Sequence, residues 1–133
     1  MRLKLAFGLA AACAFVFILP AWSHHSHGNY VDTFMDIEGI VKEVHLIVPH
    51  SWVYLEVKDA SGEPQIWALE ATGRAGLQRA GVTADTVKPG DTVKARCHRL
   101  KDGSNGCLLG FLKHKDGKVV DWDGNNAPAP TDF

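Results

Sequence analysis

Three histidines near the amino terminus have the spacing of a metal chelate. Cleavage of the chain after Ser23 would leave His24 as the first residue, followed closely by His25 and His27. A free α-amino group beside an imidazole binds borderline metals, and copper(II) favours such nitrogen donors in a tetragonal arrangement. The sequence therefore predicts a metal site, with copper as the favoured ion, at the start of the processed chain.

The residues before His24 have the three parts of a secretory signal peptide. A basic start at Arg2 and Lys4 precedes an apolar run at residues 5–19, and small residues flank Trp22. The run is shorter than the roughly 20 residues that span a bilayer. We therefore expect a periplasmic or secreted protein that does not span the membrane after cleavage. Cleavage after Trp22 instead would make His25 the third residue of the processed chain, a position that also chelates copper.

His50 is the candidate for a distant ligand, because it follows Pro49 at an expected bend between two strands. It would complete the site begun by His24, with His25 or His27 assisting. The alternative is a solvated histidine-rich arm that binds metal loosely, with His50 bonded to a backbone carbonyl. The remaining histidines are expected to be structural or exposed to solvent: His45, His98 and His114.

The second group of candidate residues is aromatic. Trp52 and Tyr54 alternate with the apolar residues of one strand, so they lie on its other face. Trp67 and Glu70 are further candidates for a surface that binds a partner or ligand, although Trp67 favours core packing. Glu70 is expected either to orient an imidazole or, preferably, to cap the helix that begins near Thr72.

Composition limits the partners. Removal of residues 1–23 leaves about 110 residues, enough for one small domain. Loss of Arg2 and Lys4 lowers the 14 basic residues to 12 against 15 acidic ones, so the net charge becomes −3. Such a chain is a poor candidate for nucleic-acid binding, which depends on phosphate contacts. A protein partner in the cell envelope remains open.

Two cysteines, Cys97 and Cys107, remain after cleavage. The turn signal at residues 102–103 would place them on adjacent antiparallel strands, and export would expose them to an oxidising compartment. We therefore expect a disulfide between them.

The hydrophobic pattern predicts an all-β domain with one short helix, at residues 36–122. A flexible arm is expected at residues 24–35 and a disordered tail at residues 123–133. Strands are expected at residues 37–48, 51–58, 65–71, 91–100, 107–114 and 119–122, with a helix at 72–80 ended by Gly81 and a bulge near residues 39–41. This order of elements is typical of a small OB-like β-barrel, with another open barrel or half-sandwich as the alternative.

Several short motifs occur together in this order. They are His24-His25-Ser26, Gly39-x-Val41, Pro49-His50-x-Trp52, Trp67-x-x-Glu70, Leu77 with Gly81, Pro89-Gly90-Asp91-x-Val93 and Asp102-Gly103-Ser104. With them, the chain resembles a widespread bacterial family of small exported proteins of unknown function. The usual pattern of that family has Asn where this chain has Val48. The resemblance implies export and a small β fold, and it implies no known reaction.

Catalysis has little support in the sequence. The serines lie in no nucleophile-elbow pattern, and neither a phosphate-binding glycine loop nor a helical His-Glu-x-x-His motif occurs. The first hypothesis is therefore carriage or sequestration of copper. The second is an envelope interaction module that binds a protein or a glycan through Trp52. A copper redox enzyme is the third.

Overall fold

The computed structural model describes residues 27–133, and these residues form mainly β-structure. The elements are η1 (His27–Asn29), β1 (Tyr30–His45), β2 (Ser51–Lys58), β3 (Pro64–Ala71), α2 (Arg74–Arg79), β4 (Thr92–Leu100), β5 (Gly106–Lys113) and β6 (Val119–Asp121). Within this range, no helix combines the length and the apolar character needed to cross a bilayer.

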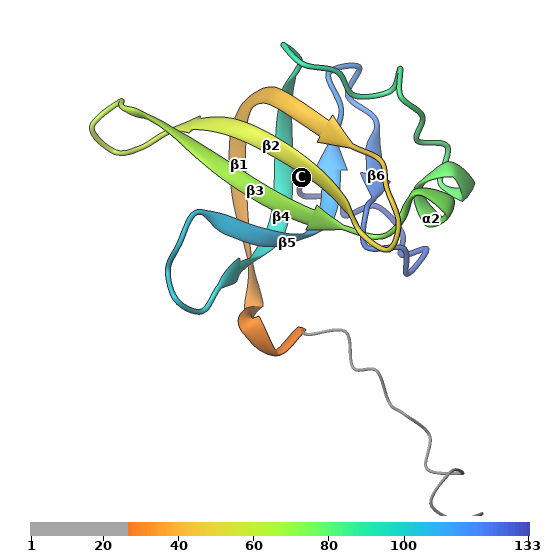
Figure 1. The fold of residues 1–133 in the computed structure, drawn as a ribbon, viewed down its shortest axis with the longest axis horizontal. Coiled ribbons are helices and arrows are strands. Elements are labelled where there is room, and N and C mark those ends of the chain that lie inside the picture. The colour runs from red at the N-terminus through yellow and green to blue at the C-terminus, as the bar shows by residue number, and fades with distance from the viewer. Residues whose placement is uncertain (1–26) are drawn as a thin grey trace, which may run out of the picture.

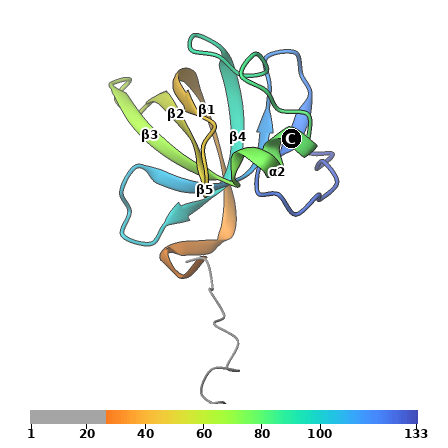
Figure 2. The same cartoon turned by 45° about the vertical axis from the view of Figure 1, so that its right-hand side comes forward.

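The strands close into a ring, as Figure 1 and Figure 2 show. Strand β1 pairs antiparallel with β2 on one side and with β4 on the other. The ring closes where residues 68–70 of β3 pair in parallel with residues 106–108 of β5. This closed order, with the helix between β3 and β4, confirms the expected OB-like, mostly β fold.

Strand β1 is 16 residues long and pairs with both β2 and β4. Its register with β2 shifts between Val41 and Glu43, so the extra residue is Lys42, beside the position predicted for a bulge. At Gly39, a Cβ atom would lie 2.6 Å from the carbonyl oxygen of Glu56. Glycine at this position therefore allows β1 to approach β2 closely where the strand bends.

The first strand differs most from its prediction. It begins at Tyr30, inside the segment expected to be a flexible arm, and it ends at His45 rather than at residue 48. Residues 34–40 pair with β4, and the ring of Phe34 lies 4.1 Å from that of His98. Backbone pairing organises this polar stretch, which carries little hydrophobic alternation for sequence reasoning to detect.

The helix is shorter than predicted. Its N-cap is Gly73, which makes no side-chain cap bond, so the predicted cap at Thr72 is wrong. The backbone N–H of Thr72 instead donates to the carbonyl of Trp122, 2.9 Å away. The predicted end is confirmed, because Gly81 follows the helix with a φ of 85°.

The core fills the ring and extends beneath α2. Its largest fully buried side chains come from four strands, from the helix and from the segment after β6: Val41, Val53, Leu55, Leu69, Leu77, Leu109, Leu112 and Trp122. Because Leu77 and Trp122 belong to this set, the helix and the end of β6 are part of the core.

The carboxy-terminal residues were expected to be disordered, and the structure differs. No helix or strand follows Asp121, yet the tail returns to the barrel, where Asp132 pairs with Arg96. The ring of Phe133 lies 5.0 Å from the Arg96 guanidinium. The low-complexity composition concealed these contacts because they depend on a distant strand.

The expected disulfide joins β4 to β5 through Cys97 and Cys107, whose Cα atoms are 5.7 Å apart. Replacing both cysteines by alanine is expected to lower the free energy of unfolding by about 2–4 kcal/mol, because the unfolded chain gains conformational freedom. Urea denaturation of the wild-type and variant proteins measures the change. The reduced wild-type protein provides the control and should resemble the variant. A change below about 0.5 kcal/mol would contradict a stabilising role for the bridge.

His114 was expected to be solvated, but it is 4 % exposed. The indole N–H of Trp122 donates to its Nε2 atom over 3.2 Å, and its Nδ1 atom is buried without a hydrogen-bond partner. Burial holds the pKa of His114 below its usual value. A proton on Nε2 would also face the indole N–H, so the fold favours the neutral ring.

This environment makes stability depend on pH. Between the unfolded pKa of about 6.5 and the lower folded pKa, the unfolded state binds more protons. The stabilisation from the neutral His114 ring is therefore complete above the unfolded pKa, and it is lost as the pH falls from the unfolded pKa towards the folded pKa. We expect His114→Gln to flatten the dependence of the unfolding free energy on pH between about pH 5 and 7. Denaturation series at several pH values measure the slope. Equal slopes for the two proteins would refute the assignment.

Candidate functional site

The Glu70 carboxylate, near the end of β3, joins two residues that are distant in sequence. The hydroxyl of Tyr30 donates to Oε2 over 2.5 Å. The Nδ1 atom of His50 contacts the other oxygen, Oε1. The side chain of Glu70 is 17 % exposed and that of His50 is 33 % exposed, so the pair lies at the edge of solvent. This cluster, Tyr30–Glu70–His50, is the candidate site.

The β1–β2 loop, residues 46–50, is fixed on both sides of His50. The backbone N–H of Arg74 donates to the carbonyl of Ile47 over 3.0 Å, and that of Ser51 donates to the carbonyl of Thr72 over 3.1 Å. The buried hydroxyl of Ser51 also bonds the backbone of Ile47. At Gly73, a Cβ atom would come within 2.6 Å of the carbonyl oxygen of Pro49. The start of α2 therefore holds the loop in place.

Tyr30 completes the cluster from the first position of β1. Its side chain is buried, and burial, the hydrogen bond to Glu70 and the charge of that carboxylate together raise its pKa well above the usual value. The phenol therefore remains a donor at physiological pH. Sequence reasoning missed Tyr30, since it lies 40 residues from Glu70 in the chain and was assigned to the arm.

The contact with Glu70 determines what His50 can do chemically. A neutral imidazole that donates through Nδ1 carries its lone pair on Nε2, the atom that binds metals in carboxylate–histidine–metal arrangements. The predicted role of Glu70 as a helix cap is wrong, because the cap is Gly73. Its alternative role, orienting an imidazole, agrees with this geometry.

The structure does not show the other predicted metal ligands beside His50. His24 and His25 lie outside them, and of His27 only the backbone is described, as the first residue of η1. Within residues 27–133, no three His, Cys, Asp or Glu side chains gather as a metal site. Among the described residues, His50 therefore does not belong to a ready-made group of metal ligands.

The predicted aromatic residues lie on two different faces of the sheet. Trp67 lies in the core at 9 % exposure, so it does not belong to the proposed surface. Trp52 and Tyr54 are half-buried on the outer side, with near-parallel rings 6.5 Å apart. The exposed ring of His45 meets Tyr54 edge-on at 5.4 Å. We call these three residues, His45, Trp52 and Tyr54, the aromatic face.

The aromatic face adjoins the candidate site. Trp52 pairs across the strands with Glu70, and Tyr54 pairs with Glu43 on one side and with the small Ala68 on the other. Carboxylates thus border the rings, and Glu43 also contacts the Nε2 atom of His45 at 3.0 Å. The His50 cluster and the aromatic face form one continuous, partly acidic region.

A separate cavity of about 410 Å³ lies between β1, α2 and the chain that follows the helix. Arg74, Gln78 and Thr83 supply its polar side chains, and the rest of its lining is mainly apolar. Neither His50 nor any residue of the aromatic face lines it, so it is distinct from the candidate site.

The chain belongs to a family of unknown function, DUF6152, which matches residues 12–109. None of the curated proteins matches this chain. The matched range includes Tyr30, His50 and Glu70, as well as both cysteines, and it ends within β5. The resemblance to an uncharacterised family is therefore confirmed, and the chemistry has to be argued from the site itself.

Proposed function

For this member of a family of unknown function, we propose that the processed chain is an exported copper-binding module for carriage or sequestration. His50 is the ligand held by the barrel, and His24 supplies the terminal amine and imidazole, with His25 or His27 assisting. The single observation that carries the proposal is the contact of Glu70 with both His50 and Tyr30.

The first argument is orientation. Metal-binding histidines usually donate their second ring N–H to a carboxylate or carbonyl, which fixes the ring and raises its basicity. Glu70 occupies that position for His50, and the β1–β2 loop is held by backbone bonds to the start of α2. Glu70 therefore restrains the imidazole, and these backbone bonds restrain the loop that carries it.

The second argument is reach. Tyr30 shares a carboxylate with His50, so the chain enters β1 beside the candidate ligand. Residues 27–29 form η1, and the 3₁₀ rise of about 2.0 Å per residue places His27 about 6 Å from the Cα atom of Tyr30. An extended chain before it would add at most about 3.6 Å per residue, which allows His24 up to about 17 Å. These lengths permit the amino-terminal donors to return to His50.

The third argument is the compartment. A leader at residues 1–23 would be removed on export, and the amine of His24 becomes a donor only after cleavage. The Cys97–Cys107 disulfide is compatible with such an environment. Copper(II), which favours nitrogen ligands, is also stable under oxidising conditions.

The test is a competitive copper(II) titration of protein processed to begin at His24. We expect His50→Ala to weaken binding at least tenfold, because the held imidazole is lost. His45→Ala is the matched control, since His45 is exposed, also contacts a glutamate and lies in the same part of the barrel. We expect it to leave the affinity unchanged. Equal copper affinities for the wild-type protein and both variants would show that His50 is not a ligand, and only a chelate in the amino-terminal segment would be left.

A second candidate function rests on the aromatic face. Near-parallel rings at 6.5 Å form a platform on which a sugar ring can stack, and Glu43 and Glu70 provide hydrogen-bond acceptors beside it. Because the neighbouring charges are mostly acidic, the face favours a neutral ligand over a phosphate-bearing one. We propose a neutral glycan as its ligand.

Chitohexaose, a neutral oligosaccharide, is a direct probe of this second candidate. We expect Trp52→Ala to reduce its binding at least fivefold in a calorimetric titration, because the stacking surface is removed. Ile66→Ala is the control, since Ile66 is an exposed apolar residue of β3. Absence of binding by the wild-type protein, or equal losses in both variants, would count against this candidate for this glycan.

A further inference from the structure

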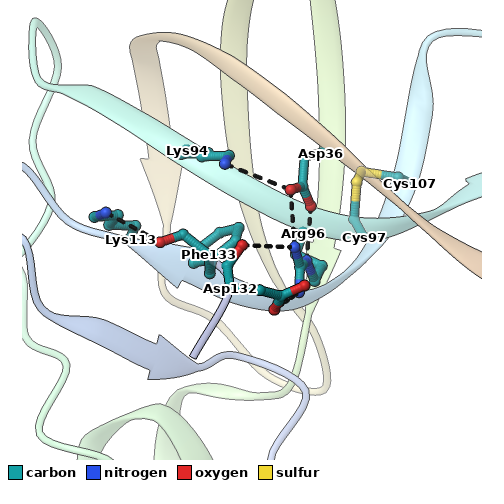
Figure 3. A network of polar contacts seen from close by, with 8 residues as sticks. All are labelled: Asp36, Lys94, Arg96, Cys97, Cys107, Lys113, Asp132 and Phe133. Carbon is teal, nitrogen blue, oxygen red and sulfur yellow. Dashed lines mark hydrogen bonds and ion pairs between the residues drawn. A yellow bond between two sulfur atoms is a disulfide. The ribbon is translucent and has the colours of Figure 1, made fainter. Parts of the chain in front are cut away.

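The tail contacts a cationic site on the outer surface of β1, β4 and β5, away from the His50 cluster. Four side chains form this site, which we call the tail cradle: Asp36, Lys94, Arg96 and Lys113. Figure 3 shows them around the last two residues of the chain. Three of the four are basic, so the cradle has a net positive charge that suits an acidic ligand.

Arg96 is the centre of the cradle, and two of its three guanidinium nitrogens bond to Asp36 of the barrel. Its Nε and Nη2 atoms donate to the two carboxylate oxygens of Asp36 over 2.8 and 3.0 Å. This bidentate pair joins β1 to β4, and the side chain of Arg96 is 15 % exposed with the tail in place. The remaining nitrogen, Nη1, donates to Asp132 over 2.7 Å. The guanidinium is thus held by the barrel and presents Nη1 to a ligand carboxylate.

Phe133 occupies a second position in the cradle. Its ring lies 5.1 Å from the ammonium group of Lys94 and 5.0 Å from the guanidinium of Arg96. Its main-chain oxygen accepts a hydrogen bond from Lys113 over 3.2 Å. A carboxylate, an aromatic ring and a backbone oxygen are therefore recognised together, as Figure 3 shows.

These contacts are weak enough to exchange. The side chain of Asp132 is 75 % exposed, so water competes for its ion pair with Arg96 and the contact contributes little stability. The tether raises the effective concentration of the tail to about the millimolar range, which explains how such contacts hold it. A ligand with the same groups can therefore compete from solution.

We propose that the tail cradle is a docking site for a peptide segment of a partner protein in which an acidic residue is followed by an aromatic one. The chain's own tail occupies the site in the absence of that partner. The tail indicates the chemistry of this ligand, because the cradle contacts the carboxylate of Asp132, the ring of Phe133 and its main-chain oxygen. This site does not depend on copper or on the aromatic face.

The test uses the full processed chain carrying D132A and F133A, so that its own tail no longer fills the cradle. A free peptide with the sequence of residues 127–133 is titrated while the NMR signals of Lys94, Arg96 and Lys113 are followed. We expect saturable shifts in the millimolar range. The wild-type chain should need at least threefold more peptide, because its tail competes.

Variant peptides provide the control, since they cannot unfold the protein. Peptides in which the aspartate or the phenylalanine is replaced by alanine should bind at least fivefold more weakly. Adding Arg96→Ala to the protein should have a similar effect. Absence of saturable binding, equal affinity for the wild-type chain or indifference to the peptide sequence would each overturn the proposal.

Discussion

One carboxylate connects three parts of the chain that carry the proposed chemistry. Glu70 belongs to β3, yet it binds the first residue of β1 and the last residue of the β1–β2 loop. Its neighbours Ala68 and Leu69 pair with β5, where the ring of strands closes. The same short stretch of β3 thus closes the barrel and connects Tyr30, the first residue of β1, to His50 through Glu70.

The hydrophobic alternation predicted the closed β-structure well, because the inner faces of β2, β3, β4 and β5 are filled by apolar residues. Strand β2 matches its predicted bounds, β3 and β4 each differ by one residue at the start, and β5 is shifted by one residue at both ends. The turn between Cys97 and Cys107 also identified the disulfide, because short-range turn chemistry sets this pairing. Core packing of Trp67, between two apolar neighbours, followed from the same pattern.

Sequence patterns failed where the contact partners are far apart in the chain. Tyr30 lies among polar residues without alternation, and its partner Glu70 is set by ring closure rather than by local spacing. The tail is rich in proline, alanine and asparagine and shows no periodic pattern, and Arg96, which binds Asp132, lies 36 residues earlier. His114 was expected to be solvated beside a charged turn, but Trp122, directly after β6, contacts it in the core. In each case tertiary contacts outweigh local composition.

The position of Trp122 has a consequence for the limits of the folding unit. The family match ends at residue 109, but the fully buried Trp122 accepts the N–H of Thr72 and donates its own backbone N–H to Gly110. A fragment cut at the family boundary would lose half of β5, all of β6 and this indole, leaving an unfilled core beneath α2. The smallest autonomous domain therefore extends at least thirteen residues past the matched segment, through residue 122.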